Sequence, residues 1–63
     1  MQGGININRI EVTFKSGKFV GFHDVVEETI EEGDGFLRFT HGEFKDIAAL
    51  RVENIDFIEF MKR

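Results

Sequence analysis

Apolar and polar residues alternate most clearly in the segment Ile10–Phe14, where every second residue is apolar. A second run with the same period, Lys18–Phe22, follows after the short stretch Lys15-Ser16-Gly17. Two alternating runs joined by a short loop that contains glycine predict a β-hairpin.

The loop length decides which residues of this hairpin face each other. A three-residue loop ending in a left-handed Gly17 sets Ile10 opposite Phe22 and gives one consistent apolar face. A two-residue loop would instead set Ile10 against His23. We therefore predict the three-residue loop.

Upstream of the hairpin, Ile5 and Ile7 fall on the opposite parity from the apolar residues of the first strand. Either a bulge near Asn8-Arg9 switches faces, or residues 1–7 form a separate segment. Two adjacent glycines within residues 1–4 predict a frayed start.

Residues 24–34 fit two structures. Asp24 followed by Glu27 has the character of a helix N-cap, and Gly33 could end a short helix over 25–32. In the extended interpretation, alternate residues share one face: Val26, Glu28, Ile30 and Glu32. A turn at Glu32-Gly33-Asp34-Gly35 would then lead into the next strand. Isolated helices of two turns are marginal, so we favour the strand.

The next segments read as two strands joined by a tight turn. Residues 36–40 predict a strand, and His41-Gly42 predicts a two-residue turn. That turn would pair Phe39 with Phe44 and Phe36 with Ile47.

The C-terminal third predicts two further strands. One begins at Asp46 and ends near Leu50, a break follows at Glu53-Asn54, and the last strand covers Ile55–Phe60. The alternative places one or two helices between residues 44 and 63, because Ala48-Ala49-Leu50 is compatible with a helix.

The predicted fold class is therefore all-β, a five- to six-stranded antiparallel meander closing into a small barrel that hides its sheet edges. The alternative is α+β, with a helix at 25–32 or at the C-terminus. The arrangement resembles the SH3-like and Sm-like small barrels. Three features carry the resemblance: the Ile10–Phe22 hairpin, the strand entry at 33–39 and the joint at Val52–Ile55. The resemblance implies a fold and transfers no functional residue.

Composition bounds the size and setting of the molecule. Sixty-three residues make a single domain, 1–63, without cysteine or proline. A chain this short buries only about 60% of its unfolded surface, so we expect association into a homo-oligomer. No apolar run reaches the ~20 residues of a membrane span, and no secretory signal is seen, so we expect a cytoplasmic protein without a membrane partner.

Candidate catalytic chemistry is sparse. Ser16 lies in the predicted hairpin turn, His41 in a predicted solvated turn, and His23 beside Asp24, where neighbouring strand residues point to opposite faces. We expect no enzyme, no cofactor and no metal. A helix over 25–32 would align His23 with Glu27 and Glu31 at ligand spacing, but a solvated acidic face is the favoured interpretation.

Charge is the most informative feature. Residues 24–34 hold six acids and no base, whereas the rest of the chain holds eight bases and six acids and is net positive by two. We predict a non-catalytic protein-interaction module whose partner has a basic surface. The predicted contact residues are Glu27, Glu28, Glu31, Glu32 and Phe19. The alternative is a nucleic-acid-associated barrel that uses the Lys15/Lys18 turn, although net charge −4 disfavours it.

Overall fold

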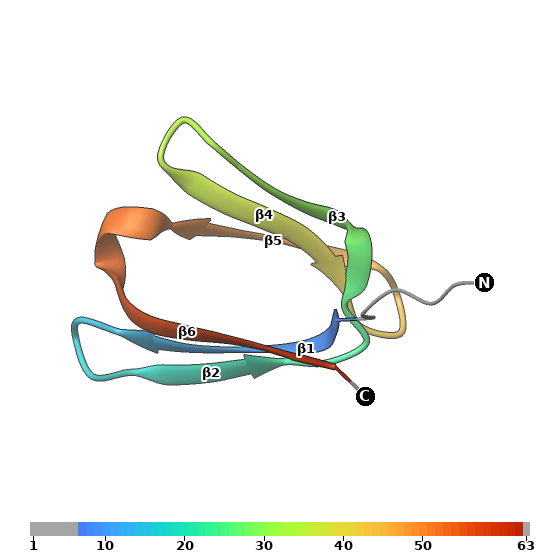
Figure 1. Ribbon diagram of the computed structural model, residues 1–63, viewed down its shortest axis with the longest axis horizontal. Coiled ribbons are helices and arrows are strands. Elements are labelled where there is room, and N and C mark those ends of the chain that lie inside the picture. Colours follow the sequence, from blue (N-terminus) through green and yellow to red (C-terminus); the bar gives the residue numbers. More distant parts are fainter. Residues whose placement is uncertain (1–6, 63) are drawn as a thin grey trace.

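Six strands make up the computed structural model, which describes residues 7–62 (Figure 1). Their bounds, in chain order, are β1 Ile7–Phe14, β2 Phe19–Phe22, β3 Val26–Gly33, β4 Phe36–His41, β5 Asp46–Arg51 and β6 Ile55–Lys62. A single 3₁₀ turn, η1 (Val52–Asn54), joins β5 to β6. The expectations for residues 1–4 and for Ile5 lie outside the described residues.

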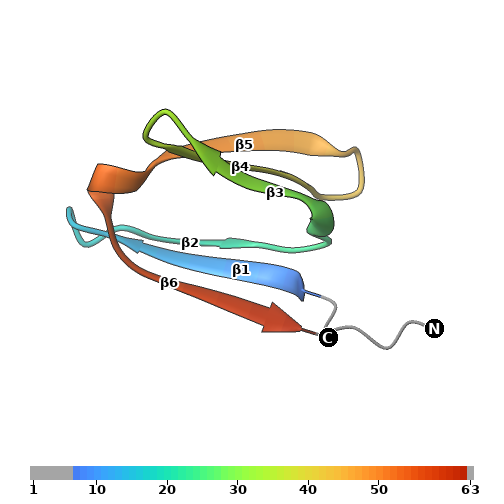
Figure 2. The same cartoon turned by 45° about the horizontal axis from the view of Figure 1, so that its top comes forward.

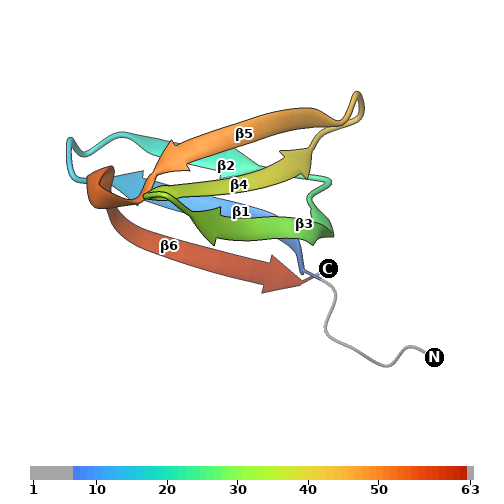
Figure 3. The ribbon, with the colours of Figure 1, turned by 90° about the horizontal axis from the view of Figure 1, so that it is seen from above.

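The strands form two antiparallel sheets of three strands each. We call them sheet A, with strand order β2-β1-β6, and sheet B, with order β3-β4-β5. The sheets lie one over the other, with β4 above β1 (Figures 2 and 3). The all-β prediction is confirmed. The α+β alternative was wrong, because no α-helix forms at 25–32 or within the described part of 44–63. Within the described range 7–62, no strand of sheet A pairs with a strand of sheet B, so barrel closure is not confirmed.

The first hairpin has the predicted register. Ile10 lies opposite Phe22, and the Phe14 N–H donates to the Lys18 carbonyl at 2.8 Å across a three-residue loop. Gly17 adopts φ +95°, which a side chain at Cβ would disfavour. Of the two alternatives for the segment upstream, the bulge near Asn8-Arg9 is present, as a register shift between Ile7 and Arg9 against β6.

Strand β3 forms as predicted but not with the predicted alternation. A register shift lies between Val26 and Glu31, so Val26 pairs with an outward residue of β4 while Glu32 pairs with buried Leu37. The two residues therefore lie on opposite faces. The turn predicted at 32–35 is present but shorter: β3 continues to Gly33, and a two-residue loop follows with φ +56° at Asp34 and +81° at Gly35.

The predicted register between β4 and β5 was wrong. Phe39 lies opposite Ala48 and Phe36 opposite Arg51. The turn holds four residues, 42–45, with φ +84° at Gly42 and +58° at Lys45, so every partner is displaced by four positions.

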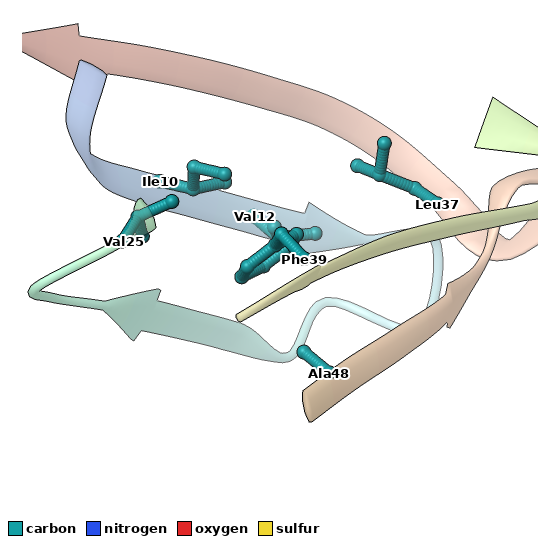
Figure 4. Packing of buried hydrophobic residues seen from close by; sticks show 6 residues of the cluster. All are labelled: Ile10, Val12, Val25, Leu37, Phe39 and Ala48. Carbon is teal, nitrogen blue, oxygen red and sulfur yellow. The ribbon is translucent and has the colours of Figure 1, made fainter. Parts of the chain in front are cut away.

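Apolar side chains from both sheets fill the space between them, and the six most buried residues converge there (Figure 4). They are Ile10, Val12, Val25, Leu37, Phe39 and Ala48. His41, predicted to be solvated in a turn, instead ends β4 half-buried, with its ring centroid 4.9 Å from that of Phe22. The Phe22 and Phe39 rings meet edge to face at 5.0 Å and tie sheet A to sheet B.

Candidate interaction surfaces

A row of three side chains crosses the outer face of sheet A. Because Ile10 and Val12 point into the core, Thr13 on the same strand points outward. Thr13 pairs with Phe19 on one side and with Phe57 on the other. The two phenyl rings remain 58% and 61% exposed, respectively. We call Phe19, Thr13 and Phe57 the phenylalanine row.

Charged groups border this row. Arg9 Nε donates to Glu11 Oε2 at 2.8 Å, and Glu59 lies opposite Glu11 on β6. The Arg9 guanidinium lies over Gly21, where a Cβ atom would come within 2.7 Å of it. The outer face of sheet A therefore combines exposed aromatic rings with a rim of mixed charge.

The four glutamates singled out from the sequence do not share one surface. Glu27 is half-buried, and its Oε1 accepts the Ile7 N–H at 2.9 Å. This hydrogen bond connects β3 to the start of β1. Glu28 and Glu31 are exposed beside a shallow hollow of about 350 Å³ near the outward face of β4. Glu32 lies near the gap between β3 and β6. Phe19 lies on sheet A, away from the glutamates of sheet B.

Most acids of this segment have no cationic partner. Within residues 7–62, the only contact of an acid of this stretch with a basic side chain joins Asp24 to His23 Nδ1 at 3.2 Å, and both side chains are exposed. These two residues lie in the loop between β2 and β3, so the expectation that they point to opposite faces of a strand was wrong. Glu28 and Glu31 therefore form no ion pair with a cation of residues 7–62.

A cluster that the sequence reasoning missed lies on the outer face of sheet B. The guanidinium carbon of Arg51 is 4.8 Å from the Phe36 ring centroid, and that of Arg38 is 5.3 Å away. Arg51 is the cross-strand partner of Phe36, which follows only from the correct β4–β5 register. The spacing of Phe36 and Arg38 on one strand was the only signal available in the sequence.

The turn of the first hairpin borders a hollow of about 450 Å³. Phe14, Lys15, Ser16, Lys18 and Asn54 line it, and the Lys15 N–H donates to the Asn54 carbonyl at 2.8 Å. The turn lies at the same end of the molecule as η1 (Figure 1). The predicted Lys15/Lys18 surface is therefore exposed and adjoins the strand end that carries Arg51.

A third hollow, of about 220 Å³, opens between the two sheets on the flank where β6 and β3 lie. Five apolar side chains and one carboxylate line it: Leu37, Val52, Ile55, Ile58, Phe60 and Glu32. We call it the flank groove. Phe60 is 44% exposed although it lies opposite the fully buried Ile10, so the groove gives access to the core face of sheet A.

Among residues 7–62, no three histidine or carboxylate side chains converge in a way that could hold a metal ion. No helix in this range is long and apolar enough to cross a membrane. Comparison with protein-family models, curated proteins and solved structures gives no match to this chain.

Proposed function

We propose that this chain is a non-catalytic protein-interaction module that acts in the cytoplasm as a homo-oligomer. The observation that carries the proposal is the phenylalanine row. Two aromatic rings, each more than half exposed, flank one small side chain on a flat strand surface. Aromatic side chains exposed side by side on a small domain are typical of a contact surface.

The acidic flank of β3 gives this module a second means of partner choice. Glu28 and Glu31 are exposed, and neither carboxylate forms an ion pair with a cation within residues 7–62. A partner with a basic surface would be attracted to them, which raises the association rate and disfavours acidic competitors. The resemblance to SH3-like and Sm-like barrels remains a prediction about fold, and the proposed function does not depend on it.

The phenylalanine row can be tested by capture from lysate of the source cells, with and without nuclease. The Phe19→Thr/Phe57→Thr variant keeps strand-forming residues but removes both rings. Phe44→Thr is the matched control, because Phe44 is 82% exposed at the β4–β5 turn and lies outside the row. We expect the wild type and the control to capture the same protein in both lysates. Equal capture by the double variant would contradict the proposal.

The acidic flank is tested separately by reversing two charges. Glu28→Lys/Glu31→Lys should slow association several-fold at low salt. Glu43→Lys/Glu53→Lys is the control, because it makes the same change in net charge elsewhere in the chain. Reversal at Glu27 is avoided because it would leave the Ile7 N–H without its acceptor. If both variants slow association equally, only net charge matters and the acidic flank is not a docking site.

The second candidate function is nucleic-acid association. The observation that favours it is the pair of guanidiniums held over Phe36, at the end of the molecule that also carries Lys15 and Lys18. The Phe36 ring is half-buried beneath them, and arginine beside an aromatic ring is a common combination in single-strand binding. This function predicts that binding falls linearly with salt on a log–log plot and that capture disappears with nuclease.

A further inference from the structure

Among residues 7–62, no strand pairs with the outer edge of β6, and the backbone groups of two of its residues point to that edge. The Phe14 N–H points to β2, where it donates to Lys18. Backbone groups alternate sides along a strand, so those of Thr13 and Glu11 point to β6, toward their partners Phe57 and Glu59. Ile58 and Phe60 alternate with these partners along β6. Their N–H and carbonyl groups therefore point away from β1.

The side chains of Ile58 and Phe60 are also two of the six that line the flank groove. Ile58 and Phe60 lie opposite Val12 and Ile10, on the core face of sheet A. A strand added to the free edge of β6 would hydrogen-bond to Ile58 and Phe60, and its own inward side chains would cover the groove. The outward backbone groups of Ile58 and Phe60 and the apolar flank groove thus both favour the addition of a strand at this edge.

The other three edges are less suited to accept a strand. Strand β2 has only four residues, and β3 is interrupted by its register shift and rich in glutamate. Strand β5 runs in unbroken register with β4, but it contributes only Ile47 to the hollow of about 350 Å³ and no residue to the flank groove. Short, bulged and charged edges resist pairing, whereas β6 is continuous from Phe57 to Met61 with one charge, Glu59.

We propose that the occupant of this edge is β6 of a second copy, paired antiparallel about a two-fold axis at Glu59. In this register Ile58 lies opposite Phe60 of the second copy, so all four outward-facing residues exchange hydrogen bonds. Phe57 lies opposite Met61 of the second copy on the outer face. Sheet A becomes a continuous sheet through both copies.

Charge favours a second copy as the occupant. Strand β6 carries an acid, Asp56, at its second position and a base, Lys62, at its last. Antiparallel pairing centred on Glu59 sets each Asp56 beside Lys62 of the other copy. The two Glu59 side chains meet at the axis, so the register also contains one specific repulsion, which removal of that charge relieves.

This inference deepens the proposed homo-oligomer and rests on it, but its test uses purified protein alone. Glu59→Cys introduces the chain's one cysteine at the axis, where the two Cα atoms would be about 4.5–5.5 Å apart, within reach of a disulfide. Met61→Cys is the control, because two copies of that position would lie about 13 Å apart. We expect mild oxidation to give a covalent dimer with the first variant and not with the second.

A second measurement removes only the outward N–H. In a synthetic chain, N-methylation of Phe60 blocks strand addition but leaves the bonds between β1 and β6 intact. Sarcosine at Gly21 is the control, because it methylates an outward N–H on the free edge of β2. By sedimentation equilibrium, the first change should weaken the dimer at least about tenfold and the second less than about twofold.

Two outcomes would overturn the inference. A chain that stays monomeric at millimolar concentration, or a dimer that forms equally well with N-methylated Phe60, shows that β6 does not pair with itself. Lysate capture that still depends on the phenylalanine row would then leave the proposed interaction surface standing. A confirmed β6 dimer without such capture would overturn only that surface.

Discussion

The hydroxyl of Thr29 takes the place of a missing backbone partner for Thr40. Its Oγ1 accepts the Thr40 N–H at 2.8 Å and donates to the Val26 carbonyl at 2.6 Å. Both bonds lie within the register shift of β3, between Val26 and Glu31, where direct pairing with β4 is interrupted. One side chain therefore closes the gap that the bulge opens in sheet B.

Replacing this hydroxyl should weaken the sheet. Thr29→Val keeps the side-chain shape but leaves the Thr40 N–H without a protein acceptor, so we expect the free energy of unfolding to fall by about 1 kcal/mol. Thr29→Ser retains the oxygen and should lose less than half as much. Urea denaturation measures both values. A loss for Thr29→Ser without a loss for Thr29→Val would show that the methyl group, not the hydroxyl, is what matters.

Turns marked by glycine could be predicted from the sequence. Gly17 and the pair Asp34-Gly35 adopt the positive φ values that short hairpin turns require, so both turns, and the register of the first hairpin, followed from local chemistry. The turn after β4 could not be predicted in the same way. Lys45 adopts φ +58° there, a conformation for which the lysine side chain gives no signal.

Only part of the candidate contact surfaces could be predicted from the sequence. Phe19 follows from the hairpin register alone, but Phe57 joins it because a bulge near Asp56 shifts the pairing of β6 against β1. A bulge of this kind depends on tertiary packing rather than on local propensity. The same limit applies to Arg51, whose contact with Phe36 requires the four-residue turn.

Two neighbouring glycines should respond oppositely to alanine. Gly35 adopts φ +81°, so Gly35→Ala should lower the free energy of unfolding by about 1–2 kcal/mol through backbone strain. Gly33 ends β3, and a Cβ there meets nothing within 4 Å. Gly33→Ala should therefore be neutral or stabilising by up to about 1 kcal/mol. Thermal denaturation of both variants decides this, and a loss at Gly33 as large as at Gly35 would contradict the turn geometry.

Gly21 and Arg9 should be energetically coupled. A Cβ at Gly21 would come within 2.7 Å of the Arg9 guanidinium, which must swing away and leave Glu11. Because the displaced group is the end of a flexible, partly exposed side chain, Gly21→Ala should cost less than about 1 kcal/mol. In an Arg9→Ala background the same change should cost nothing. A double-mutant cycle measures the difference, and additive effects would show that the two side chains do not compete for this space.

The eight phenylalanines should differ widely in their contribution to stability, as Phe39 and Phe44 illustrate. Phe39 is 1% exposed and packs between the two sheets, whereas Phe44 is 82% exposed in the β4–β5 turn. Phe39→Ala removes about 3–5 kcal/mol, which is comparable to the whole stability expected of a domain this small, so that variant should be unfolded. Phe39→Leu keeps most of the volume and should remain folded, with a loss of about 1–2 kcal/mol.

Phe44→Ala provides the comparison at the exposed position. We expect it to change the free energy of unfolding by less than about 0.5 kcal/mol, because the ring is already in water in the monomer. Urea denaturation at low protein concentration measures the monomer alone, so that association does not contribute. A loss at Phe44 that matched the loss for Phe39→Leu would mean that the β4–β5 turn folds back over an apolar surface. The four-residue turn, and with it the register of β5, would then be wrong.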